Sequence, residues 1–515
     1  MLDLARSFLA SVARDPYALA IVDGEVRLTY AAWLRHVCAV VAGLDDLGLR
    51  PGDHLLTLLQ NRWEAATLHW ACQLAGIIIT PLNWRATGEE VDYVATDAGA
   101  RAVVYEAASA EALAGAVHAR SLPRVMIGDA LPPDATGFAT WLAQDAPDVA
   151  PRARADAWSL MLYTSGTTAR PKGVPRRHAA ERAAAVAHVA QNLYARGERT
   201  LGVMPLYHTI GVRSLLAMSL IGGTFVCLPR FDAAQALRLI AAERVSNLYL
   251  VPTLYHDLLH HPDFAAHDVS SVRRLGFAGA PMTDALLRDA SAAFRPLLFV
   301  NHYGSSEIYT FTIDQDAAAK PGSAGRAGIN GQIRVVRPGG APDDVVPPGT
   351  EGEIIALAAS DEAFEGYWNR PDADARALRD GWYYTGDTGL FDADGDLFVT
   401  GRVDDMIITG GENVSPVEVE RCLSLHPAVR EVAVAGLSDA RWGQIVAAFI
   451  TCAAPVDAAA LDAHTRAAGL AGYKRPRRYV FVREIPKSAV GKLLRRKLVA
   501  GDYTLDETIG KDTPQ

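Results

Sequence analysis

A short polar segment in the first third of the chain carries residues suited to holding phosphate. Residues 163–173 read Tyr-Thr-Ser-Gly-Thr-Thr-Ala-Arg-Pro-Lys-Gly. Hydroxyl groups and exposed N–H groups can wrap phosphate oxygens, while Arg170 and Lys172 offset their charge. The spacing is not that of the GxxxxGK[ST] loop, and a Ser/Thr/Gly cluster alone is equally typical of an ordinary polar loop. The candidate ligands are Thr164, Ser165, Gly166, Thr167, Thr168 and Lys172.

Three further side chains have chemistry that a nucleotide site could use. Glu307 ends the segment Asn-His-Tyr-Gly-Ser-Ser-Glu, and a carboxylate there is a plausible Mg²⁺ ligand because magnesium prefers oxygen and shares substrate phosphates. Asp387 could accept two charge-assisted hydrogen bonds from a vicinal diol. Lys492 is one of only seven lysines among 50 basic residues. Taken singly, each would more often be a solvated surface residue.

The segments around these residues predict parallel sheets covered by helices. Apolar runs at 102–106, 201–206, 247–252, 273–280 and 297–304 predict strands, and three- and four-residue periodicity predicts helices at 233–245 and 283–294. Ligands bind beyond the C-terminal ends of such strands. The loops that follow Tyr163, Met204, Phe277 and His302 lie at those ends.

The pattern changes near residue 345. Short strand-like runs at 351–357 and 396–402 indicate a small β-rich unit, and a further α/β segment follows Arg402. We therefore expect an α/β protein with a large N-terminal domain over residues 1–403 and a smaller α/β domain over 404–515. The large domain would contain parallel-type sheets with packed helices plus the small β-rich subdomain.

Composition restricts the class of protein. A chain of 515 residues exceeds what one core usually supports, and a net charge of −9 argues against a general nucleic-acid binder. Five cysteines without a CxxC spacing fit a reducing compartment. The first 16 residues predict an amphipathic helix rather than a signal peptide, and the apolar stretch 215–228 is too short and glycine-broken to span a bilayer. We expect a cytoplasmic monomer or homodimer with no membrane or nucleic-acid partner.

The complete strings are more specific than their single residues. Residues 163–173, 301–307, Tyr-Thr-Gly-Asp at 384–387, 401–405 and 486–492 resemble the signatures of the adenylate-forming superfamily. This superfamily contains acyl-CoA synthetases, peptide-synthetase adenylation domains and luciferase-like enzymes. The segments 401–413, 441–444 and 473–479 most resemble aryl-CoA synthetases of the 4-chlorobenzoate:CoA ligase type. Ala169 departs from the pattern, since the family usually has glycine there.

The resemblance implies ATP and Mg²⁺ as partners of these motifs. It assigns Glu307 to magnesium, Tyr303 to stacking on adenine, and Asp387 with Arg402 to the ribose hydroxyls. The residues implied in ATP or AMP binding beyond the phosphate loop are Gly279, Ala280, Pro281, His302, Tyr303, Gly304, Ser305, Ser306, Asp387 and Arg402.

The resemblance also implies a two-step catalytic cycle. Lys492 would contact the attacking carboxylate and the α-phosphate, offsetting charge that builds on the phosphorus oxygens. His208 could close over the carboxylate, although a packing role is an alternative. Asp404 aligns with the residue about which the mobile C-terminal domain turns between acyl-adenylate formation and thioester formation.

A coenzyme A site and an acyl pocket complete the implied set. Arg85, Arg475 and Arg477 would take the CoA phosphates, Trp442 and Tyr473 would flank its adenine, and Glu412 would contact CoA. A helix-capping arginine and a core aromatic are the alternatives for Arg85 and Trp442. The residues that resemble an aryl pocket are Val186, His208, Thr209, Ile210, Tyr249, Ala280, Tyr309 and Thr310.

These residues predict an AMP-forming, ATP-dependent carboxylate:CoA ligase. A wall of apolar and hydroxyl groups suits a small planar acid, so benzoate, hydroxybenzoates or a heteroaromatic acid such as furoate are open. A medium-chain acyl-CoA synthetase and an enzyme that loads a carrier protein are the alternatives within the family. A luciferase-like oxygenase and a nucleotide-binding regulator without catalysis are more distant ones.

Overall fold

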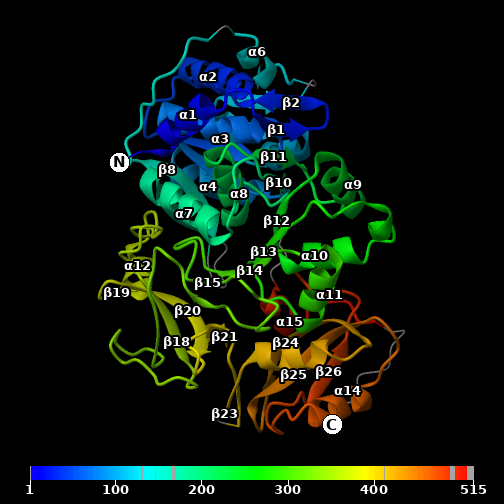
Figure 1. Cartoon of the computed structure of the whole chain (residues 1–515). Coiled ribbons are helices and arrows are strands. Elements are labelled where there is room, and N and C mark those ends of the chain that lie inside the picture. Colours follow the sequence, from blue (N-terminus) through cyan, green and yellow to red (C-terminus); the bar gives the residue numbers. More distant parts are fainter. Residues whose placement is uncertain are drawn as a thin grey trace.

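The chain folds into three neighbouring parts, seen at the top, lower left and lower right of Figure 1. The computed structural model describes residues 2–128, 131–144, 146–164, 170–410, 412–487 and 493–506, with only the backbone described for Asp404 and Asn413. The top part holds two mixed sheets with their helices. The lower parts are a β-rich sheet and the C-terminal α/β unit.

The larger sheet carries several of the predicted site segments at its strand ends. Its central strands β10 to β14 and β1 are parallel, while β2, β15 and β16 pair antiparallel at the two edges. In spatial order the strands are β16 (Arg326–Ala327), β15 (Thr312–Asp314), β14 (Leu298–Tyr303), β13 (Arg274–Ala278), β12 (Asn247–Leu250), β10 (Arg199–Gly202), β11 (Thr224–Cys227), β1 (Leu19–Asp23) and β2 (Val26–Thr29). The strands predicted within 247–252, 273–280 and 297–304 are thereby confirmed, whereas the run at 201–206 shares only residues 201 and 202 with β10.

The second sheet brings the phosphate segment to its edge. All of its pairings are parallel except the last, in which β9 runs antiparallel to β8. Its strands are β7 (Thr136–Gly137), β6 (Arg124–Ile127), β5 (Ala100–Glu106), β3 (His54–Leu58), β4 (Ile78–Pro81), β8 (Trp158–Thr164) and β9 (Lys172–Arg177). The β8–β9 pairing therefore ends at Thr164 and Lys172, on either side of the undescribed residues 165–169.

Helices with apolar faces cover both sheets and bury the core between them. They are α1 (Leu4–Arg14), α2 (Tyr30–Asp46), α3 (Trp63–Ala75), α4 (Gly88–Ala98), α5 (Ala110–Ala114), α6 (Phe138–Leu142), α7 (His178–Gln191), α8 (Thr209–Leu220), α9 (Ala233–Glu243), α10 (Pro252–Leu259) and α11 (Asp284–Phe294), with short turns η1 (Ala107–Ser109), η2 (Ala119–Ser121) and η3 (Phe264–Ala266). The predicted N-terminal helix is α1, and Asp3 caps it by accepting a hydrogen bond from the Arg6 amide. The apolar stretch 215–228 divides into the end of α8 and strand β11. Across the described ranges, no helix is both long and apolar enough to cross a membrane.

The β-rich part is a separate antiparallel sheet. Its elements are β17 (Ile333–Val336), β18 (Gly352–Leu357), α12 (Pro371–Ala377), β19 (Leu378–Arg379), β20 (Trp382–Phe391) and β21 (Leu397–Arg402). The turn η4 (Val403–Asp405) follows β21 directly, and the next strand belongs to another sheet. The division between residues 403 and 404 falls within this turn and stays a proposal.

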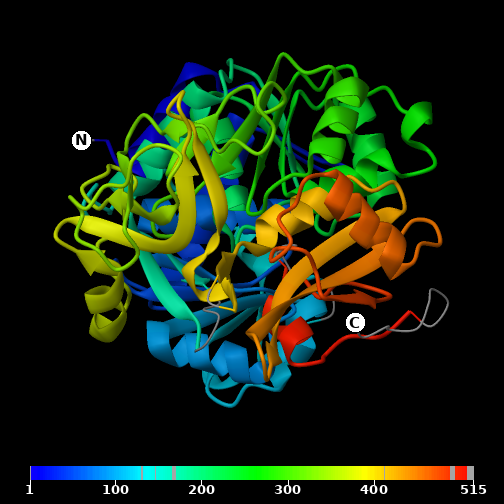
Figure 2. The same cartoon turned by 90° about the horizontal axis from the view of Figure 1, so that it is seen from below.

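The C-terminal unit has its own sheet and its own apolar core. Its elements are β22 (Ile407–Thr409), β23 (Glu412–Val414), α13 (Pro416–Ser424), β24 (Val429–Asp439), β25 (Gly443–Cys452), α14 (Ala458–Ala467), β26 (Arg478–Phe481) and α15 (Arg495–Val499). Figure 2 shows this unit beside the β-rich sheet. Arg421 of α13 forms an ion pair with Asp284 at the start of α11, 2.9 Å away, so the unit also contacts the large N-terminal part.

Candidate active site

Three residues predicted to hold a nucleoside meet where the large sheet contacts the β-rich sheet. Asp387 of β20 lies opposite Arg402 of β21 in register, and the Arg402 guanidinium donates to its carboxylate at 2.8 Å. The Tyr303 hydroxyl, from the end of β14, donates to the other carboxylate oxygen at 2.6 Å. Burial and the Asp387 carboxylate raise the pKa of Tyr303 well above its usual range, so this hydroxyl remains a neutral donor. The three residues that the sequence analysis assigned to the nucleoside are therefore in direct contact with one another.

Gly386 shows why the backbone at this cluster needs glycine. Its φ is +72°, and a Cβ there would lie 3.0 Å from a nitrogen of the Arg402 guanidinium. A side chain would be strained in this left-handed conformation and would crowd the arginine. The glycine of the Tyr-Thr-Gly-Asp string thus lets Arg402 reach Asp387.

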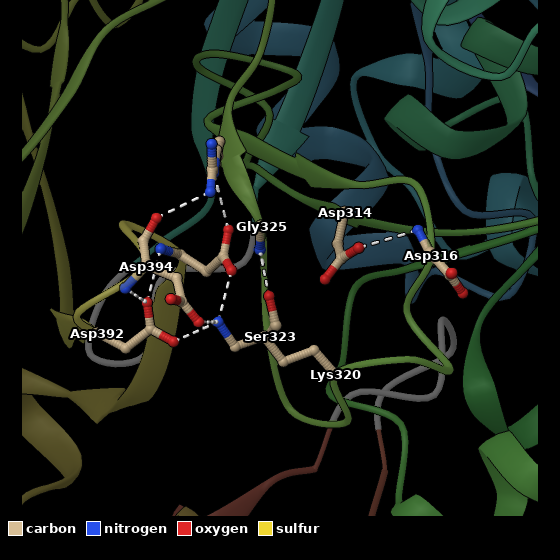
Figure 3. A network of polar contacts seen from close by, with 9 residues as sticks. Asp314, Asp316, Lys320, Ser323, Gly325, Asp392 and Asp394 are labelled. Atoms are coloured by element: carbon tan, nitrogen blue, oxygen red, sulfur yellow. Dashed lines mark hydrogen bonds and ion pairs between the residues drawn. The ribbon is translucent and has the colours of Figure 1, made fainter.

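An ion-pair network holds the β20–β21 hairpin against the segment that follows β14 (Figure 3). The Lys320 ammonium lies 2.5, 2.8 and 2.6 Å from carboxylate oxygens of Asp392, Asp394 and Asp396 respectively, in the turn between β20 and β21. Arg326 adds a bond to Asp396 at 3.0 Å. The three aspartates could geometrically hold a metal ion, but the Lys320 ammonium lies within 2.8 Å of all three and, with Arg326, offsets part of their charge. We interpret the network as an anchor that fixes Asp387 and Arg402 relative to Tyr303.

Glu307 and Lys172 share a second, more buried corner. The Glu307 carboxylate accepts a hydrogen bond from the Tyr367 hydroxyl at 2.7 Å, and its backbone carbonyl accepts one from Arg176 at 2.9 Å. The Lys172 ammonium lies 3.9 Å from the centre of the Tyr367 ring. Burial lowers the pKa of Lys172, and the nearby Glu307 charge acts in the opposite direction. A cation and a carboxylate at the mouth of the β8–β9 hairpin suit a phosphate group and its counter-ion.

Part of the predicted phosphate site lies outside the described residues. The predicted site residues outside the described ranges are Ser165, Gly166, Thr167, Thr168 and Lys492. Thr164 and Lys172 face each other in register at the ends of β8 and β9, so they bracket the undescribed segment.

The turn after β14 is closely packed. The Ser305 hydroxyl accepts a hydrogen bond from the Glu307 amide at 3.2 Å, and a Cβ on Gly304 would lie 2.1 Å from the Tyr309 carbonyl oxygen. Ser306 offers its carbonyl to Arg176 at 3.5 Å.

His302 lies on the opposite face of β14 from Tyr303, because adjacent strand residues alternate. It is buried beside Asn192, whose side chain is 3.1 Å from its Nε2, and beside the rings of His188 and Tyr249. Burial, followed by the Arg213 charge, lowers the pKa of His302 well below its usual value, so the ring is neutral. The prediction grouped this side chain with the nucleotide residues, but the structure places it with the acyl-pocket residues.

Three predicted acyl-pocket residues converge on Arg213 of α8, which the sequence reasoning missed. The Arg213 guanidinium donates to the Thr310 hydroxyl at 2.8 Å, to the Tyr309 carbonyl at 3.3 Å and to the Tyr249 hydroxyl. All four side chains are buried. The signal that could have indicated it is that Arg213 is the single charged residue in the apolar sequence TIGVRSLLAMSL. A buried charge needs polar partners, so such a residue predicts a polar cluster.

The remaining pocket residues are positioned by the start of α8 and the loop after β13. His208 is the N-cap of α8, and Thr209 and Ile210 form its buried first turn. A Cβ on Gly279 would lie 3.7 Å from the Ile210 side chain, so the loop that continues through Ala280 and Pro281 passes α8. Val186 differs from the prediction, since it is 43% exposed on α7 while His188, two residues later, faces the Tyr249 ring.

The residues assigned to CoA form two groups. In the C-terminal unit the Trp442 ring lies between Gly410, where a Cβ would be 2.7 Å from it, and the Arg477 guanidinium, 4.4 Å from its centre. Tyr473 is 41% exposed and Arg475 pairs with Asp462 at 3.5 Å. Glu412 is exposed at the start of β23.

Arg85 is the member of this set that belongs to the N-terminal part. It is exposed, and its guanidinium stacks on the Trp84 ring at 3.8 Å. Burial raises the pKa of Tyr207, and the nearby Arg85 charge opposes that rise. Arg85 therefore lies near Tyr207, the residue that precedes His208.

Two surface cavities lie away from these groups. One of about 700 Å³ is lined by Asp3, Arg6, Arg154, Ala155, Asp156, Arg177, Ala179 and Glu365. The other, of about 360 Å³, lies on the neighbouring surface and shares Arg154 and Arg177. Neither includes a predicted site residue, so the chemistry of the residues, rather than cavity size, locates the candidate site.

Comparison with known proteins gives consistent matches over nearly the whole chain. Residues 8–368 match the model described as AMP-binding enzyme, and residues 418–492 match AMP-binding enzyme C-terminal domain. A feruloyl-CoA synthase of Amycolatopsis sp is 36% identical over 491 residues, covering 93% of this chain and 95% of that protein. A 4-chlorobenzoate–CoA ligase of Arthrobacter sp is 34% identical over 497 residues, covering 95% and 93%. The solved structure of an anthranilate CoA ligase with anthranoyl-AMP has a TM-score of 0.89 at 27% identity, covering 97% of each chain.

Proposed function

Since this chain belongs to the adenylate-forming family of AMP-binding enzymes and is an acid–thiol ligase, we propose that its acid is a small aromatic or heteroaromatic carboxylate, such as benzoate, a hydroxybenzoate or furoate. The observation that carries this proposal is a buried, hydrogen-bonded cluster among the residues predicted for the acyl pocket. Tyr249, Tyr309 and Thr310 are tied together by Arg213 and are almost fully buried. A long alkyl chain would have to displace this hydrogen-bonded wall, whereas a single ring would not.

In the first proposed step, a carboxylate oxygen attacks the α-phosphorus of ATP and the bond to pyrophosphate breaks. Asp387 and Arg402 would hold the ribose hydroxyls, and Tyr303 would stack on adenine. Lys172 would neutralise phosphate charge, and Lys492 would offset the charge that builds on the α-phosphate. Catalysis is then mainly orientation and electrostatics.

The buried Glu307 carboxylate fits a magnesium ion. Magnesium is usually held by one or two carboxylates plus substrate phosphates, and Glu307 offers one carboxylate beside the proposed phosphate segment. Tyr367 and Arg176 orient this residue from two sides. When bound, magnesium would supply charge neutralisation for the phosphate oxygens.

In the second proposed step, the CoA thiol attacks the acyl carbon and AMP leaves. The C-terminal unit would turn about Asp404 and present Trp442, Tyr473, Arg475, Arg477 and Glu412 to CoA, with Arg85 supplied by the N-terminal part. Five free cysteines and the negative net charge support a cytoplasmic enzyme without a nucleic-acid partner. We propose a monomer or homodimer.

A pyrophosphate-release screen tests the proposal. The panel contains benzoates, heteroaromatic acids and fatty acids of graded length, each with and without CoA. We expect the highest kcat/KM for an aromatic or heteroaromatic acid, and a CoA thioester as product. Higher kcat/KM for fatty acids of medium length would overturn the acid class, and pyrophosphate release without any thioester to free CoA would favour a carrier-loading enzyme.

A further inference from the structure

Arg213 is a buried cation whose hydrogen bonds leave part of its guanidinium unused. The side chain is 3% exposed, and its three bonds go to Tyr249, Tyr309 and Thr310. Its Nε has no hydrogen-bond partner although arginine carries five donors. An unsatisfied buried donor therefore lies among the residues predicted for the acyl pocket.

No carboxylate in the described part of the chain forms an ion pair with Arg213. Glu362 is near enough for the arginine to oppose the rise that burial causes in its pKa, but it bonds instead to Asn330 at 3.0 Å. A buried arginine without a close counter-ion is costly unless another group completes its hydrogen bonds. A bound acid could provide that group.

We infer that Arg213 is the specificity-determining residue of the acyl pocket and that it recognises an acceptor oxygen carried by the substrate ring, away from the carboxylate that reacts. This inference rests on the proposed function. The substrate class that it names is a small aromatic acid with a ring hydroxyl, carbonyl or second carboxylate, and not an acid whose ring is apolar throughout.

Arg213 lies further along α8 than the proposed position of the reacting carboxylate. His208 caps the helix, and Arg213 is five residues further on. Five helical residues advance about 7.5 Å along the axis and turn about 140°, so the two side chains leave the helix in different directions. The test therefore includes ring oxygens at both the meta and the para position.

The test compares pairs of acids that differ only in hydroxyl against methyl, namely 3-hydroxybenzoate with 3-methylbenzoate and 4-hydroxybenzoate with 4-methylbenzoate. The wild-type enzyme should favour the hydroxy acid of at least one pair by about 10- to 150-fold in kcat/KM, as expected for a hydrogen bond to a charged group. Arg213→Met should reduce that ratio to near one. Arg274→Met, which removes a partly buried arginine paired with Glu198 elsewhere, should keep it.

Each other outcome has a defined meaning. Equal loss of kcat/KM for both acids of a pair in Arg213→Met would show that the arginine only supports the fold, and would refute the inference. A wild-type preference for the methyl acids would refute it without any variant. If Arg213→Met does not fold, Tyr249→Phe decides, because it removes a partner of the guanidinium and leaves the arginine. A retained hydroxyl preference then supports Arg213, and a lost one assigns recognition to Tyr249. If only fatty acids are activated, the proposed function itself fails.

Discussion

Replacing Asp387 by asparagine removes one charge from the proposed ribose site while keeping its shape. The carboxylate accepts from Arg402 at 2.8 Å and from Tyr303 at 2.6 Å, so its orientation is fixed before the nucleotide arrives. The amide of Asp387→Asn keeps one acceptor oxygen but turns a donor NH₂ group toward one of these donors. The ribose hydroxyls would therefore lose charge-assisted acceptors and meet a less ordered partner.

The size of the effect follows from the number and type of bonds. A hydrogen bond to a charged group is worth about 1.5–3 kcal/mol, which corresponds to roughly 10- to 150-fold in affinity. We expect the KM for ATP of Asp387→Asn to rise by that factor, with the KM for the acid little changed. Tyr303→Phe, which removes a single hydroxyl donor, should raise the KM for ATP by less than Asp387→Asn does.

Acid-dependent pyrophosphate release at varied ATP measures this, with melting temperatures to confirm folding. Glu243→Gln is the matched control, because the Glu243 carboxylate is also paired with an arginine, Arg27, at 2.8 Å, and its side chain is 13% exposed against 16% for Asp387. Glu243 ends α9 and is not part of the proposed nucleotide cluster. If both variants raised the KM for ATP equally, the ribose role of Asp387 would be wrong.

Three further predictions concern the lysine, the CoA site and acid stability. Lys492→Ala should abolish acid-dependent pyrophosphate release yet leave thioester formation from a supplied acyl-adenylate largely intact; equal loss of both half-reactions would refute the role given to Lys492. Trp442→Ala should raise the KM for CoA and spare that for ATP, and an unchanged KM for CoA would remove the tryptophan from the site. Burial lowers the pKa of His69 to about 3 and of His178 to about 4, so the unfolded chain takes up their protons first as pH falls below about 6.5. Thermal melts between pH 7 and 4.5 should show the unfolding free energy falling by about 1.4 kcal/mol per pH unit for each of these two histidines. The slope should be shallower in His178→Gln. An identical slope in that variant would contradict a lowered pKa for His178.

The fold could be predicted to the level of strands and helices because local patterns determine those elements. The runs at 247–252 and 297–304 became β12 and β14, and the periodic segment at 283–294 became α11. The edge strands β15 and β16 were not predicted, since three- and two-residue strands leave almost no pattern in the sequence.

The candidate site could be predicted where a residue sits within a distinctive string. Tyr303 lies 84 residues before Asp387 along the chain, and Arg402 lies 15 residues after it, yet the three side chains meet in one cluster. Arg213 and Tyr367 escaped prediction because their role depends on contacts made by the fold, not on neighbours in sequence. His302 was grouped with Tyr303 because the string was read as a unit, although alternation in a strand turns adjacent side chains to opposite faces.

The most direct test of the central claim follows an oxygen atom through the reaction. The best acid from the panel is labelled with ¹⁸O in its carboxylate and incubated with the enzyme, ATP, magnesium and CoA, and the products are weighed by mass spectrometry. Attack of the carboxylate on the α-phosphorus predicts AMP that carries one ¹⁸O, together with unlabelled pyrophosphate and a CoA thioester of the acid. Unlabelled AMP, or label in inorganic phosphate with ADP as the nucleotide product, would contradict the acyl-adenylate mechanism.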